Sequence, residues 1–556
     1  MSTEIEVPVP PATSGSFLSR ARDQLGGWWE NPNPVWVREL RQSARLSRTP
    51  VVLAVLTVMV TLLISSIGGM ASVSARPAKV GVALFHTFFS LAFLVVTWLG
   101  PAVAASTISS ERSGRTWEAL LLTGIGPSAI ARGKFFAALS YLSLYVVMLA
   151  PVGALPFLFG GVTATEVAAA FLLLLLFGAL SVAFGLAVSS RFWNQAAAII
   201  VTLIVAIPLS LTGYIVLGPV LSIAVNGVWP VVPAGPPVWL PTAYVRADFG
   251  FRYFVLLVAA PAFSLLGPVW LLYELTKANL KDTSDDRSTG VRIWFVATTP
   301  LLIAMLSSVA WLSAGAEWFA ASVGAFFVYL IGVAVLFAGE PLGPSRRVAV
   351  HWTREGVGRL QRFLGPGLTR ANTLLAVFGL LGFALLAAAA HVWAEVASGT
   401  RAQALGVGAV SAHLAAFFVF LVGLATWLRS RSSAAGPPRL LVLAAVFVFG
   451  VGPWIAMAIA GVLAKTDSAL LMLAAPSPAY AAVLYEKVAV GTLTSHAGIV
   501  PAAVISGALL VLSGLGLSLL GKLRIQRRVS EERRWVEHWE TTFATEPAPG
   551  PDAPAP

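Results

Sequence analysis

Apolar runs of about 20 residues recur along almost the whole chain, and they constrain its fold more than any other feature. An α-helix of about 20 residues covers the roughly 30 Å hydrocarbon core of a bilayer. Of the 556 residues, 57% are hydrophobic and 11% are charged, whereas soluble domains average about 25% charged residues. Short alternating strands typical of a membrane barrel do not occur. We therefore predict an all-α integral membrane protein.

The hydropathy pattern predicts twelve transmembrane helices, which we interpret as a six-plus-six arrangement. The seventh and eighth are separated only by residues 315–317. The expected spans are 50–68, 82–108, 135–160, 166–190, 195–222, 252–275, 292–314, 318–339, 373–395, 408–428, 440–464 and 498–521.

The distribution of basic residues predicts the orientation of these spans. With the amino terminus in the cytoplasm, 30 of the 37 lysines and arginines fall on the cytoplasmic side, as the positive-inside rule requires. Both termini are then cytoplasmic, and the first 30 residues do not resemble a cleavable signal peptide. The net charge of +12 is thereby explained by membrane orientation rather than by nucleic-acid binding. An excess of arginine over lysine, with much alanine, glycine and proline, favours a GC-rich bacterium and hence its cytoplasmic (inner) membrane.

Residues for catalysis are missing from the sequence. Cysteine is absent, the six histidines are scattered, and Gly133-Lys134 lacks the rest of a phosphate-binding GxxxxGK[ST] loop. No acidic or basic residue lies deep inside a predicted span, although ion-driven transporters usually need one there. We therefore predict no metal, no bound cofactor and no ATPase site in this chain, so that its energy comes from a partner.

The cytoplasmic segment 1–49 is predicted to end in an interfacial helix. Asn33 can cap this helix, Pro34 suits its first turn, and Trp36 suits the headgroup level. A plain cytoplasmic flank that only sets topology is the alternative. The cationic face of the helix would carry Arg38, Arg41 and Arg45.

A charged segment at 109–134 separates the second and third spans. It is too long for a tight turn and too polar to cross the bilayer, so we expect it in the cytoplasm. Trp117, Leu120 and Leu121 fall on one helical stripe, which predicts a surface that docks a partner or lies on lipid. Gly124 and the residues up to Pro127 are expected to end that helix.

This segment resembles the permease subunits of type-2 ABC exporters, and the resemblance extends over about residues 31–275. Arg115 stands at the position where that family usually has glycine. The matching residues are Glu111, Arg112, Gly114, Thr116, Trp117, Glu118, Leu120, Leu121, Thr123, Gly133 and Lys134, with Asn31–Leu40 similar to the family's interfacial helix. The resemblance implies that residues 50–275 form a six-helix permease domain. It further implies that the 109–134 loop couples this domain to a separate ATPase subunit, which holds ATP and Mg²⁺.

The second half repeats the pattern without the motif. We expect a cytoplasmic linker at 276–291, a second six-helix domain at 292–521 and a cytoplasmic tail at 522–556 that is disordered at its end. A loop at 340–372 falls where a second coupling loop would lie. The second domain is interpreted as a degenerate repeat, with unrelated added spans as the alternative. The transporter would then be a homodimer, which we favour, or an internal pseudo-dimer.

The predicted external segment 224–251 is rich in proline, glycine and tryptophan, so it cannot be one helix. An outer gate and an inert aromatic belt are both compatible with it. The residues expected to form such a gate are Trp229, Trp239, Pro241 and Tyr244.

Three other classes compete with an ABC permease. A secondary transporter of the major facilitator type also has twelve spans, and residues 111–115 fit part of its loop motif. Against it, too few apolar residues follow before Arg132 for a span to begin at once. A membrane-embedded transferase would need more charged groups at a membrane face. A non-transporting scaffold needs no such residues.

Overall fold

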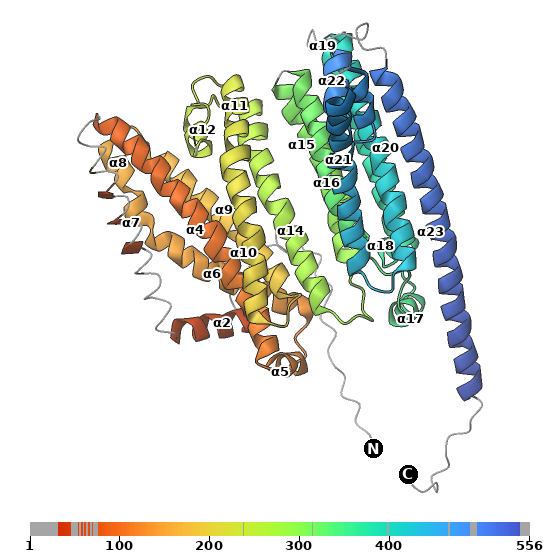
Figure 1. Cartoon of the computed structure of the whole chain (residues 1–556). Coiled ribbons are helices and arrows are strands. Elements are labelled where there is room, and N and C mark those ends of the chain that lie inside the picture. Colours follow the sequence, from red (N-terminus) through yellow and green to blue (C-terminus); the bar gives the residue numbers. More distant parts are fainter. Residues whose placement is uncertain are drawn as a thin grey trace, which may run out of the picture. The chain divides into compact units, whose positions relative to one another are not determined.

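A computed structural model describes residues 32–45, isolated positions between 54 and 69, and then 76–236, 238–313, 315–396, 400–464, 468–489 and 498–544. Within these ranges the chain is helical and contains no strand (Figure 1). Eleven helices in them are long and apolar enough to cross a membrane. The prediction of an all-α multi-pass membrane protein is confirmed. The predicted first span, 50–68, and the end of the predicted tail lie largely outside the described residues.

The chain divides into two compact units, Met1–Thr212 and Gly213–Pro556. This division differs from the boundary predicted at 276–291, because the sixth predicted span belongs to the second unit. That span is α14 (Ala260–Leu280), which packs against α15 (Thr289–Leu312). The indole Nε1 of Trp294 donates a hydrogen bond to the carbonyl of Gly267 at 2.9 Å and joins the two helices.

The first unit is built around α4 (Pro77–Ser113), which packs along α9 (Ala164–Ser189) and α10 (Gln195–Thr212). The third predicted span, 135–160, is shifted and broken. Its helix, α6, runs from Pro127 to Met148, and two short segments, α7 (Ala150–Gly153) and α8 (Leu155–Phe159), follow it. Proline near the start of each short segment interrupts the helical hydrogen bonding.

The short helix α2 (Pro34–Arg45) packs across the amino-terminal end of α6 (Figure 1). Between α4 and α6 lies α5 (Trp117–Leu122). The helices α2, α4 and α6, together with α5, position the candidate site.

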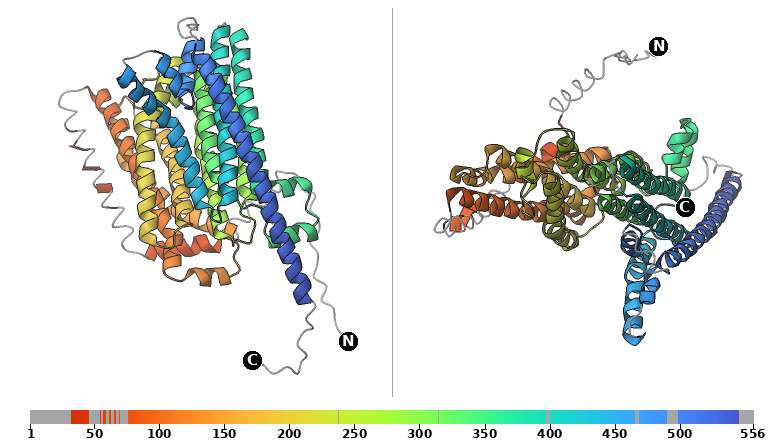
Figure 2. Two further views of the ribbon diagram at one scale, coloured as in Figure 1. Left: turned by 45° about the vertical axis from the view of Figure 1, so that its right-hand side comes forward. Right: turned by 90° about the horizontal axis from the view of Figure 1, so that it is seen from above.

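The second unit has a core of phenylalanine and other apolar side chains from α15, α16 (Ala316–Phe337), α19 (Leu368–Val396) and α20 (Arg401–Arg431). Along α20 packs α23 (Ile499–Ala544), and a Cβ on Gly423 would lie 2.0 Å from the carbonyl oxygen of Gly514. Glycine is needed at this crossing because the backbones touch. Within this unit, α23 extends beyond the end of α20 (Figure 2).

The other elements of the second unit connect these helices. They include π-helical turns at Gly213–Leu217 and Phe254–Ala259, which lie within apolar helices. The remaining helices are α11 (Gly218–Val228), α12 (Leu240–Arg246), α13 (Phe251–Tyr253), α17 (Arg346–Arg354), α18 (Arg359–Leu364), α21 (Gly436–Ala464) and α22 (Tyr480–Ala489).

Candidate functional site

The charged segment after the second predicted span folds into a tight turn and one short helix. Helix α4 continues through Glu111 to Ser113, so Glu111 projects from its last turn. The chain then reverses at Arg115, whose φ of 58° is the one positive φ at a non-glycine residue in the described part of the chain. The amide of Thr116 donates to the carbonyl of Glu111 at 3.0 Å and closes this turn. After α5, Gly124 with a φ of 72° redirects the chain into α6.

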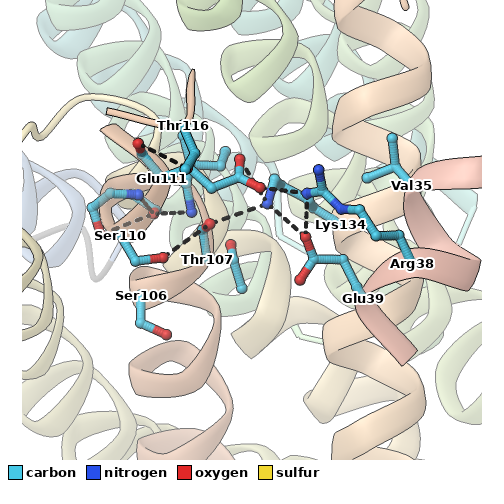
Figure 3. A network of polar contacts seen from close by, with 12 residues as sticks. Val35, Arg38, Glu39, Ser106, Thr107, Ser110, Glu111, Thr116 and Lys134 are labelled. Carbon is cyan, nitrogen blue, oxygen red and sulfur yellow. Dashed lines mark hydrogen bonds and ion pairs between the residues drawn. The ribbon is translucent and has the colours of Figure 1, made fainter. Parts of the chain in front are cut away.

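Four charged side chains from three helices meet beside this turn, and we call them the ionic cluster: Arg38, Glu39, Glu111 and Lys134 (Figure 3). Lys134 is fully buried. Its Nζ donates to Glu39 Oε1 at 3.1 Å and to the carbonyl of Thr107 at 3.1 Å. The same Nζ lies 3.1 Å from Glu111 Oε2.

Arg38 completes the ionic cluster from the more exposed side. Its Nη2 donates to Glu39 Oε1 at 2.8 Å and also donates to Glu111 Oε1. Each carboxylate therefore faces two cations, and α2, α4 and α6 are joined by charge pairs. Such pairs add specificity because a buried charge without its partner is costly.

Electrostatic interactions within the cluster favour the charged forms of Arg38 and Glu39. Burial acts to lower the pKa of Arg38, but Glu39 and Glu111 outweigh it and raise that pKa. Burial acts to raise the pKa of Glu39, but Lys134 and Arg38 outweigh it and hold that pKa below its ordinary value. All four groups are thus engaged with one another, and no cluster of three or more metal-ligating residues exists among the described positions.

Close backbone packing fixes α2 against α6. Asn33 caps α2, because its Oδ1 accepts a hydrogen bond from the amide of Val35 at 2.9 Å. Its Nδ2 donates to the carbonyl of Ala129 at 2.8 Å. A Cβ on Gly133 would lie 2.7 Å from the Cβ of Val35 and 2.8 Å from Asn33 Oδ1. Glycine at 133 is therefore required for this approach, which also brings Lys134 to Glu39.

The position of α5 depends on Arg112. This side chain donates from Nη1 to the carbonyl of Ser190 at 2.7 Å, at the end of α9. Its guanidinium carbon lies 5.2 Å from the ring centre of Trp117 and 5.2 Å from that of Trp193, within the range of cation–π attraction. Trp117 is thereby held against the ends of α4 and α9.

The predicted docking stripe faces the interior of the chain instead of a partner. Trp117 and Leu120 are buried within this chain, with 8% and 5% of their surface exposed, so neither is available as a docking surface. The physical reason is that Arg112 and the end of α4 pack against this apolar face. The outward side of the segment carries Glu118 and Leu122, and Leu122 is 88% exposed. Thr123, Gly114 and Thr116 are also exposed, and the side chain of Leu121 lies outside the described set.

A helix, α2, forms where the sequence predicts the interfacial helix, and its interfacial position stays a prediction. Trp36 packs against α6, because its Nε1 donates to Ser140 Oγ at 3.3 Å and its ring lies against Phe136. Arg41 is exposed, and the Arg45 side chain lies outside the described set. Our reading of the sequence missed Glu39. Its signal is that it is the one acid among the arginines of this helix.

The four predicted gate residues come together in the second unit. Trp229 and Trp239 belong to one apolar cluster with Tyr244, and Pro241 is buried in α12. The hydroxyl of Tyr253 in α13 donates to the carbonyl of Tyr244 in α12 at 2.9 Å and joins these two helices. A gating role for these residues stays a prediction.

Residues 72–243 match a family described as ABC-2 family transporter protein. This range contains α4, the 114–126 turn and α6, together with the sequence motif that was matched above. Over these residues the chain is similar to the ABC-2 family of transporter permeases. Two residues of that motif, Glu111 and Lys134, form the ion pair that joins the second and third predicted spans. A search of curated proteins finds no match.

Proposed function

We propose that this chain is an ABC-2 permease, the membrane subunit of an ATP-driven exporter, and that a separate ATPase docks on its α5 segment. The ionic cluster is the observation that carries the proposal. It links the turn beside α5 to two membrane-crossing helices, α4 and α6, and to α2. Force applied to α5 is thus delivered to α4 and α6 together, which favours alternating access driven from the cytoplasm.

The outward side of α5 supplies the proposed contact with the ATPase. Leu122 is a large apolar side chain at the tip of a polar turn, with 88% of its surface exposed. Beside it, the exposed Glu118 can pair with a basic group of the partner. An aliphatic side chain that fills a pocket on the partner can anchor an interface. ATP and Mg²⁺ would be held by the ATPase alone.

Co-purification tests this docking surface. Leu122→Asp should abolish recovery of the ATPase with the permease and leave membrane insertion intact. Phe249→Asp is the matched control, since Phe249 is 90% exposed and lies in the predicted external segment. Normal recovery with Leu122→Asp, or an equal loss with Phe249→Asp, would refute docking at α5.

The assembly is proposed as a homodimer in a bacterial cytoplasmic membrane, so that two copies of α5 meet two ATPase subunits. A single-chain pseudo-dimer is the second arrangement, and the 340–372 loop favours it because the loop forms α17 and α18. Trp352 of α17 is buried, whereas Leu360 of α18 is 75% exposed. The mass of the purified complex decides between the two: a homodimer contains two permease chains, and a pseudo-dimer contains one.

A further inference from the structure

A cavity of about 530 Å³ lies in the second unit between two loop segments and α23. One segment, 342–344, follows α16, and the other, 366–370, leads into α19. The opposite wall is formed by residues of α23 between Ile525 and Arg534. Its volume is in the range of small-molecule sites. It is separate from the ionic cluster and does not depend on the proposed docking of an ATPase.

The polar lining of the cavity is cationic. Arg370 and Arg534 line it together with Thr369, Gln526 and Ser530, and none of the described lining residues is acidic. Arg370 is held in place, because its Nη1 donates to the carbonyl of Arg362 at 2.6 Å and its guanidinium lies 5.3 Å from the ring centre of Trp352. A guanidinium has five N–H donors, and this hydrogen bond occupies one. Two arginines with two hydroxyl groups fit a phosphate group.

The remaining lining is apolar and lies at the level where a membrane helix leaves the bilayer. Leu342, Ile525 and Val529 face the cavity. The apolar run of α23 ends at Gly521, before Lys522, so the cavity lies just beyond the apolar portion of this candidate membrane span. The surrounding segments are basic, with six arginines in 340–372 and six lysines or arginines in 522–534. Basic segments beside a membrane helix attract anionic lipids.

We propose that this cavity binds the phosphate headgroup of an anionic membrane lipid. Arg370, already oriented by Trp352, and Arg534, from α23, would bind the phosphate, while the hydroxyls of Thr369 and Ser530 complete its coordination. The apolar side chains contact the start of the acyl chains. A bound lipid would tie the α23 extension to the loop that precedes α19.

Native mass spectrometry of the purified full chain tests this site. The probes are phosphatidylglycerol and phosphatidylcholine with the same acyl chains, and inorganic phosphate is added in excess as a competitor. Arg534→Gln removes one cation. Gly343→Leu fills the cavity without a change of charge, because a Cβ on Gly343 points to Val529 at 3.6 Å. Arg524→Gln is the matched control, because Arg524 is an exposed arginine of α23 outside the lining.

The expected result is selective retention of phosphatidylglycerol that excess phosphate does not displace. Arg534→Gln and Gly343→Leu should each weaken it about tenfold, the change that corresponds to ~1.4 kcal/mol, while Arg524→Gln leaves it unchanged. Equal retention of both lipids, an equal loss in Arg524→Gln, or no effect of Gly343→Leu would overturn the proposal. Displacement by inorganic phosphate would also overturn it and assign the cavity to a free anion.

Discussion

Replacing Lys134 by methionine tests the ionic cluster at its most buried point. Methionine keeps much of the length of the side chain and removes the charge. Lys134 is fully buried, and Glu39 and Glu111 are 21% and 14% exposed. Removing one partner of a buried pair typically costs about 3–5 kcal/mol, because the remaining charge is unpaired. Arg38 and water partly compensate, so Lys134→Met should destabilise the first unit by about 3 kcal/mol.

The measurement is the free energy of unfolding of the purified chain in mixed micelles. It is obtained by titrating the micelles with a denaturing detergent. Lys79→Met is the control, because Lys79 is an exposed residue near the other end of α4. It should change that free energy by less than about 0.5 kcal/mol. Adding Glu39→Gln and Glu111→Gln to Lys134→Met should recover at least half of the loss, since no unpaired carboxylate then remains. Equal effects of Lys134→Met and Lys79→Met would refute the reasoning.

Further predictions concern the same region. Gly133→Ala should detach α2, because the added Cβ would clash with Val35, and proteolysis of α2 should become faster. Gly126→Ala, whose added Cβ meets nothing within 4 Å, should leave the rate of proteolysis unchanged. Arg115→Gly should raise the melting temperature by relieving a left-handed backbone worth about 1 kcal/mol, whereas Arg115→Ala, which keeps the Cβ, should not. The lowered pKa of Glu39 stabilises the fold above its ordinary value of 4.5, and this contribution is lost as the pH falls through the lower folded pKa. The gap in unfolding free energy between wild type and Glu39→Gln should therefore be constant from pH 8 to about 5 and shrink below about 4.

Hydropathy located most of the helices that are long and apolar enough to cross a membrane, because the length of an apolar run is a local property. It separated α15 from α16 across three residues, but it did not predict the shift and the break of the third span. It could not predict that α14 packs with α15, a contact that includes the hydrogen bond from Trp294 to a glycine 27 positions earlier.

The candidate site was predictable in its location and not in its contacts. The motif led to Glu111 and Lys134, but the bond between Lys134 and Glu39 joins residues 95 positions apart. Helical spacing correctly grouped Trp117 with Leu120. It could not predict that this face would pack against Arg112 inside the chain. Periodicity shows which residues share a helical face, but it does not show what that face contacts.

The most direct test of the central claim is to determine on which side of the membrane the α5 segment is exposed. The chain has no cysteine, so Glu118→Cys offers a single reactive thiol on the outward side of α5. A membrane-impermeant maleimide should label it in inside-out vesicles and not in intact cells, and bound ATPase should protect it. Labelling from outside intact cells, or no protection by a bound ATPase, would contradict the coupling role that we assign to α5.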